Sequence, residues 1–134
     1  MSSLFPIFFP FSRNQFWYGF YKVDANGKGE FSHAFANGSG IDGDTYCASA
    51  ILTSDAGTAM YAFTARAGVN AGGSERFVNF SLQRPVEWWK GIAGITFLVK
   101  ECNKFGIDKK GAGVFLDTVK SIVPDVSKRS TSGF

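Results

Sequence analysis

Residues 14–36 of this 134-residue chain read NQFWYGFYKVDANGKGEFSHAFA, two aromatic-rich runs on either side of Asp24-Ala25-Asn26-Gly27. An Asn-Gly pair between two alternating apolar runs is the strongest short-range signal for a β-hairpin. The pattern predicts a strand over 14–24, a tight turn, and a return strand over 29–36. Side chains alternate along a strand, so Phe31, His33 and Phe35 are expected on one face of the return strand.

The first strand carries aromatic rings on both of its faces. From Phe16 to Tyr21 the aromatic residues occupy odd and even positions, and the whole chain contains 15 Phe. Because successive side chains point to opposite sides of a sheet, only one set of rings can belong to the core of that sheet. The other set has to meet a second subunit, a nucleobase, or the N-terminal segment of the same chain.

Three more strands are predicted downstream, over 45–53, 58–67 and 75–83. The turn Ser54-Asp55-Ala56-Gly57 joins the first two of them, and glycine-rich loops flank the set. The last strand alternates most cleanly: its inward residues are Val78, Phe80 and Leu82, and its outward residues are Asn79, Ser81 and Gln83.

The C-terminal third is predicted to be helical. After Arg84-Pro85, an apolar stripe of helical spacing runs through Trp88, Ile92, Ile95, Val99 and Cys102. A second helix is expected from about Asp108 or Gly113 to Val123, where Pro124 stops it, with Phe115, Val119 and Ile122 on its apolar face. The expected fold is α+β: an antiparallel meander of about five strands, followed by two C-terminal helices packed on one face.

The chain divides into three parts. Residues 1–12 form an extended hydrophobic arm, residues 13–126 a single α+β domain, and residues 127–134 a basic polar tail. Pro6 and Pro10 remove backbone donors from the arm, so it is not expected to be a helix or a central strand. It lacks a basic n-region and is too short to span a bilayer, so neither a signal peptide nor a membrane anchor is predicted.

Composition indicates a globular protein, with 45% hydrophobic and 19% charged residues. Cys47 and Cys102 have no partners at metal-ligand spacing and are predicted to be buried free thiols, which suits a reducing cytoplasm. The net charge is +3, and residues 84–134 contribute nine basic against five acidic side chains. The positive charge is therefore expected at the helical end.

No catalytic, metal or cofactor site is predicted. His33 is the only histidine and lies between Phe31 and Phe35, where a packed ring is expected. The segment from Asp24 to Phe35 is superficially similar to an EF-hand loop, but Lys28 and Phe35 stand where calcium ligands are required. The sequence therefore predicts a binding protein and not an enzyme.

The favoured function is binding of single-stranded DNA or RNA by a small homo-oligomer, encoded by a phage or mobile element. Aromatic rings on a sheet stack on bases, and cations at the strand ends follow the phosphates. The predicted contacts are Arg13, Trp17, Tyr18, Phe20, Tyr21, Lys22, Lys28, Arg66, Arg76, Lys109, Lys110, Lys128 and Arg129. The N-terminal arm and the helices are expected to join the subunits in a cytoplasmic protein.

The alternative is a self-assembling structural protein of a virus or phage, located in the virion. A sheet followed by two helices is similar, in topology, to the coat proteins of small single-stranded RNA phages. In that case the second aromatic face is a subunit interface. The two hypotheses differ over Trp17 and Tyr21, which stacking requires to be accessible and assembly requires to be buried.

Overall fold

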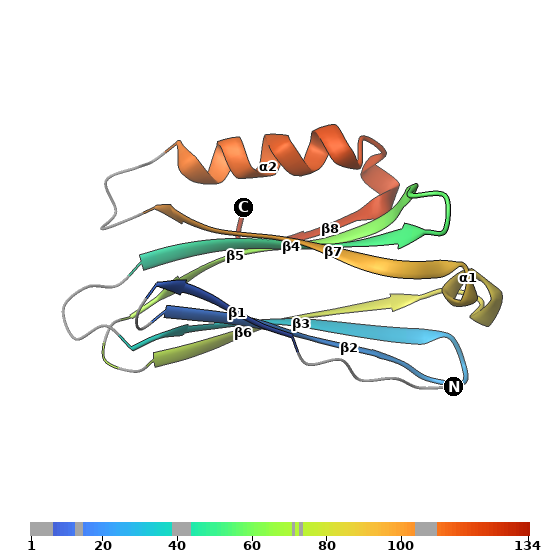
Figure 1. Ribbon diagram of the computed structural model, residues 1–134, viewed down its shortest axis with the longest axis horizontal. Coiled ribbons are helices and arrows are strands. Elements are labelled where there is room, and N and C mark those ends of the chain that lie inside the picture. Colours follow the sequence, from blue (N-terminus) through green and yellow to red (C-terminus); the bar gives the residue numbers. More distant parts are fainter. Residues whose placement is uncertain (1–6, 13–14, 39–43, 71, 73, 104–109) are drawn as a thin grey trace.

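The computed structural model describes residues 7–12, 15–38, 44–70, 72, 74–103 and 110–134, which form two packed sheets and two helices (Figure 1). Sheet A is antiparallel, in the order β1 (Ile7–Ser12), β2 (Gln15–Val23), β3 (Lys28–Asn37) and β6 (Ser74–Gln83). Sheet B has the order β7 (Ile92–Asn103), β4 (Asp44–Ser54), β5 (Ala59–Val69) and β8 (Arg129–Ser132), with β8 parallel to β5. The two helices are α1 (Val86–Lys90) and α2 (Gly111–Ile122).

The α+β class is confirmed, but the single five-stranded meander is wrong. All five predicted strands exist, within two residues of their predicted ends, and β2 and β3 form the predicted hairpin. However, β4 and β5 belong to sheet B, and β6 returns to pair with β3. Alternation shows which way a side chain points but not which strands pair, so the sequence pattern could not divide the strands between two sheets.

The first predicted helix is also wrong beyond its opening turn. The helix α1 ends at Lys90, and the rest of the apolar stripe lies in the strand β7. Both faces of this strand are covered: Ile95, Phe97 and Val99 pack towards sheet A, while Leu98 and Cys102 pack towards α2. A strand covered on both faces loses the polar alternation that identifies strands, and its apolar run fits a helical spacing equally well.

The second predicted helix is confirmed as α2, which lies across the outer face of sheet B (Figure 1). Its buried residues Phe115 and Val119, together with Val123, pack on the β4 and β5 residues Ile51 and Ala62. Ile122, expected on the apolar face, is 43% exposed. Because most of the first predicted helix is the strand β7, α2 is the one predicted long helix that packs on sheet B.

The main core lies between the two sheets. Phe31 of β3 and Phe63 of β5 stack across the interface, with ring centroids 5.5 Å apart and planes 4° from parallel. Trp17, Phe35 and Tyr46 are also fully buried there. The predicted inward residues of β6, Val78, Phe80 and Leu82, belong to or pack against the same core, as expected.

The two ends of the chain contribute strands. Part of the predicted arm is β1, which pairs only with β2 at the edge of sheet A, where prolines are tolerated. Part of the predicted polar tail is the short 3₁₀ turn η2 (Val126–Lys128), and Arg129–Ser132 is β8, the edge of sheet B. β1 and β8 thus each form one edge of a sheet.

Cys47 and Cys102 form a disulfide, with Cα atoms 5.8 Å apart, so the prediction of free thiols is wrong. The error followed from the misassigned helix, because only the pairing of β4 with β7 brings these two residues together. No helix among the described residues is long and apolar enough to cross a membrane.

Candidate nucleic-acid interface

The outer face of sheet A carries a row of aromatic side chains. Even-numbered residues of β2 point away from the core, and the register places Tyr18 beside Ala34 of β3, which in turn lies beside Phe77 of β6. We call Phe16, Tyr18, Phe20 and Phe77 the outer aromatic row. Ala34, between Tyr18 and Phe77 on the outer face, is only 1% exposed.

No helix of the described residues lies over this row, since α2 covers the opposite side of the molecule (Figure 1). Phe77 is 51% exposed, whereas Phe16, Tyr18 and Phe20 are half-buried. The Tyr18 ring meets Phe20 and Phe77 edge to face, at centroid distances of 5.5 Å and 6.5 Å. The rings therefore support one another while part of their surface stays in solvent.

A carboxylate stands at one end of the row. The Tyr18 hydroxyl donates a hydrogen bond of 2.8 Å to Glu75 Oε1. Partial burial of the ring, and then this carboxylate, raise the pKa of Tyr18. The hydroxyl is therefore a stable hydrogen-bond donor, and the bond orients the ring.

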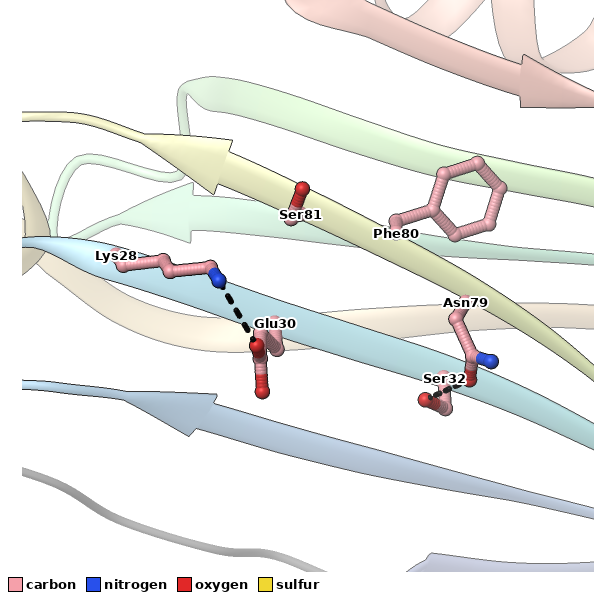
Figure 2. A pocket seen from close by; sticks show the side chains of 6 residues that line it. All are labelled: Lys28, Glu30, Ser32, Asn79, Phe80 and Ser81. Carbon is pink, nitrogen blue, oxygen red and sulfur yellow. Dashed lines mark hydrogen bonds and ion pairs between the residues drawn. The ribbon is translucent and has the colours of Figure 1, made fainter.

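Beside the row lies a polar hollow of about 400 Å³, lined by Lys28, Glu30, Ser32, Asn79, Phe80 and Ser81 (Figure 2). Ser32 Oγ donates a hydrogen bond of 2.5 Å to Asn79 Oδ1, and Lys28 Nζ lies 3.5 Å from Glu30 Oε1. Ser32 pairs with Phe20 on one side and with Asn79 on the other. The hollow is therefore continuous with the aromatic row.

Two of the predicted stacking residues are not on this face. Trp17 is fully buried, and Tyr21 is 8% exposed with its ring 6.0 Å from that of Trp89. Burial raises the pKa of Tyr21 to about 12. Because these rings form the core between the sheets, they cannot stack on bases in this fold. Of the predicted stacking rings, only Tyr18 and Phe20 lie at the surface.

The predicted cations are divided between two sides of the molecule. Lys22 and Lys28 lie on the outer face of sheet A. Arg76 instead follows the inward side of β6, where its Nη1 donates to the Gly68 carbonyl of β5 in sheet B. The others belong to the sheet B side: Arg66 on β5, Lys110 at the start of α2, Lys128 on η2 and Arg129 on β8. Arg13 and Lys109 lie outside the described residues.

Sequence reasoning did not select Phe77 and Asn79 as site residues. The signal was present, because Phe77 interrupts the otherwise polar outward series of β6 with a large ring. Its significance depends on the pairing of β6 with β3, which places it across Ala34 from Tyr18. That pairing could not be read from the hairpin signals.

His33 is a structural residue, as predicted. Trp17 Nε1 donates to its Nδ1 over 3.0 Å, so its Nε2 carries the proton and donates to the Phe63 carbonyl over 2.9 Å. Burial lowers the pKa of His33 to about 4, which keeps the ring neutral. This pair of bonds joins sheet A to sheet B in the core.

Asp44 is a buried carboxyl group that is held by hydrogen bonds. Asp44 is 5% exposed and accepts hydrogen bonds from Gln15 Nε2 over 2.7 Å and from the Tyr46 hydroxyl over 3.4 Å. Among the described residues, no three His, Cys, Asp or Glu side chains gather closely enough to hold a metal ion. The outer face of sheet A is thus the most developed candidate surface.

Comparison with protein-family models, curated proteins and solved structures finds no match to this chain.

Proposed function

We propose that the chain is a non-catalytic protein that binds single-stranded DNA or RNA on the outer face of sheet A. The observation that carries the proposal is the outer aromatic row, partly exposed on an antiparallel sheet beside uncharged hydrogen-bonding side chains and Lys22 and Lys28. Proteins that bind single strands combine stacking rings with cations in this way. Unpaired bases offer the flat faces that such rings require, whereas a duplex keeps them stacked.

Electrostatics contribute little to the proposed binding. The outer face holds Lys22 and Lys28, opposed by Glu30 and Glu75, and Lys28 is already paired with Glu30. Each phosphate contact changes the logarithmic salt slope by about 0.7 for a single strand. We therefore expect a slope of about −1 to −2, so stacking supplies most of the affinity.

A second candidate function is assembly through the same face, and one observation favours it. The face carries both signs of charge, and the Tyr18–Glu75 bond places a carboxylate where a phosphate would be repelled. Two copies related by a twofold axis would bring Lys22 or Lys28 of one copy near Glu30 or Glu75 of the other. The protein would then be a homo-oligomeric structural component of a virus or phage.

The disulfide bears on the proposed compartment. Disulfides persist in oxidising surroundings and are rare in a reducing cytoplasm. The predicted cytoplasmic location depended on free thiols. Because Cys47 and Cys102 are bonded, that argument is lost. We propose that the protein resides in oxidising surroundings. A virus or phage particle outside the cell is one such location.

The test is fluorescence anisotropy with a labelled single strand of about 16 nucleotides, the upper site size for one sheet module. A matched duplex is titrated in parallel. Phe77→Ala should weaken single-strand binding about 5- to 100-fold, equivalent to the loss of one stacked base. Phe134→Ala removes a comparably exposed ring, 41% accessible at the C-terminus, and should change nothing.

Two outcomes would reject the proposal. One is an absence of binding at low salt. The other is equal weakening by the Phe77 and Phe134 substitutions. If Phe77→Ala instead converts an oligomer to a monomer in sedimentation velocity, the outer aromatic row is a subunit interface and the second candidate replaces the first.

A further inference from the structure

We propose that the polar hollow beside the outer aromatic row reads the hydrogen-bonding edge of an unpaired base, with Asn79 as the principal contact. This inference rests on the proposed function and adds base discrimination to it. Stacking alone tolerates every base, because every base has a π-face. Discrimination needs donors and acceptors held in fixed positions at the edge of the stacked ring.

The Asn79 amide is held in one orientation. Ser32 Oγ donates to Asn79 Oδ1 over 2.5 Å, which directs the amide oxygen towards β3 and leaves Nδ2 with two hydrogens to donate. Ser32 Oγ, having given its own proton to Asn79, keeps lone pairs that can accept. The two side chains, joined by this bond in Figure 2, line the hollow and together present a donor and an acceptor.

Phe77 and Phe20 lie close enough to Ser32 and Asn79 for one base to stack on a ring and reach the pair with its edge. Asn79 follows Phe77 by two residues on the same face of β6, which is about 6.6 Å along a strand. Phe20 lies in the same cross-strand row as Ser32 and Asn79. A base stacked on either ring therefore extends its edge over the hollow.

The complementary ligand is a base edge with an acceptor next to a donor. Adenine and cytosine carry an exocyclic N–H donor beside a ring-nitrogen acceptor, whereas guanine and thymine carry a carbonyl acceptor beside a ring N–H donor, so a donor and an acceptor held in fixed order favour one of these two groups. In a duplex these Watson–Crick edges are occupied by the opposite strand. The hollow thus supplies a physical reason for preferring single strands. The Lys28–Glu30 pair at its other end, 3.5 Å apart, offers a further donor and acceptor.

The experiment compares affinities for three labelled homopolymers of about 16 nucleotides, oligo-dA, oligo-dC and oligo-dT. The wild-type chain should separate the best from the worst strand by about 5- to 100-fold, the discrimination expected of a well-made base contact. Asn79→Leu keeps a side chain of similar size without polar atoms. In this variant the affinity ratio between the best-bound and the worst-bound strand should fall to about twofold. The binding that remains then comes from stacking alone.

Gln83→Leu is the matched control. Gln83 is an amide on the same face of β6, outside the lining of the hollow, and its Nε2 donates to the Asn26 carbonyl over 2.8 Å. This variant should leave the ratio between strands unchanged. Thermal melts of both variants confirm that the fold is retained.

The possible results distinguish a failure of base discrimination from a failure of single-strand binding. Equal binding of all three strands by the wild-type chain overturns base reading and leaves single-strand binding intact. Unchanged discrimination by Asn79→Leu removes the hollow from the site. If no strand binds, the proposed function falls and the inference falls with it.

Discussion

Trp17 and Phe77 are both aromatic residues of sheet A, but they occupy opposite faces. Trp17 is fully buried and donates to His33, while Phe77 is 51% exposed. Trp17→Ala should therefore lower the free energy of unfolding by about 3–5 kcal/mol, the usual cost of truncating a buried Trp. Urea denaturation measures this loss, and a variant of wild-type stability would contradict the assignment of Trp17 to the core.

His33 should give the protein a measurable dependence of stability on pH. Its pKa is about 4 in the folded chain, below the ordinary value of about 6.5 expected in the unfolded chain. The unfolded chain therefore binds the proton first as the pH falls, so stability is complete above about pH 6.5 and declines towards pH 4. At pH 5 we expect a loss of roughly 2 kcal/mol relative to pH 7.

This titration is readily assigned because His33 is the only histidine. Asp24 and Asp125 have a lowered pKa, so their protonation affects stability at a lower pH than that of His33. His33→Gln replaces the ring with a side chain that does not titrate. Urea denaturation of this variant at pH 7 and pH 5 should give nearly equal stabilities, and a loss as large as that of the wild type would refute the assignment.

At the scale of elements, the short helix α1 fastens the β2–β3 hairpin. Trp89 is 4% exposed, and its Nε1 donates to the Gly27 carbonyl over 2.8 Å. The indole lies against Gly29, where an added Cβ would approach Trp89 Cη2 to 2.1 Å. Gly29 is therefore required by the docking of α1.

Gly29→Ala should lower stability by about 1–3 kcal/mol, as overpacking of a core generally does. Tryptophan fluorescence should change as well, because the Trp89 indole has to move. Gly68→Ala is the control, since an added Cβ there meets nothing within 4 Å. Equal stability of the two variants would show that α1 does not pack on Gly29 in solution.

The elements that sequence reasoning found are those with local signals. The β2–β3 hairpin follows from Asn26-Gly27, and α2 follows from the spacing of Phe115 and Val119 with Pro124 behind them. β7 was missed because one face meets the core and the other meets α2, so its apolar residues do not alternate. The division into two sheets was missed because strand pairing is not a local property.

The candidate site was predictable in part for the same reason. Tyr18 and Phe20 were expected from the aromatic run of the first strand, and Lys22 and Lys28 as cations near strand ends. All four lie on one face. Alternation could not decide which set of β2 rings would be buried, since that depends on where sheet B lies. Phe77 and Asn79 entered the site through the register of β3 with β6.

At the scale of the whole molecule, the disulfide joins strands that are distant in sequence. Cys47 and Cys102 close a loop with a sequence separation of 55. Chain-entropy arguments give roughly 4 kcal/mol of stabilisation for a loop of this length. The Cys47→Ser/Cys102→Ser double variant should lose about this much in urea denaturation, and wild-type protein should show no free thiol when labelled in denaturant. Complete labelling would contradict the bond.

The distribution of charge between the two sides gives a further prediction. Lys128 and Arg129 lie with β8 on the sheet B side, away from the outer aromatic row. Replacing both by Ala should leave the salt slope of single-strand binding unchanged. Lys22→Ala should reduce the slope by about 0.7, the value for one phosphate contact. If only the Lys128/Arg129 double substitution reduces the slope, the nucleic acid binds on the sheet B side instead.

The alternation of the chain between two layers also has a consequence for how the protein folds. β3 pairs with β6 and β4 pairs with β7, so each layer needs strands from both halves of the chain. Neither layer can be completed while the other half is still unfolded. Such high contact order places the folding time in the range of about milliseconds to seconds. The β2–β3 and β4–β5 hairpins can pair locally, but neither layer is closed until distant segments of the chain have met.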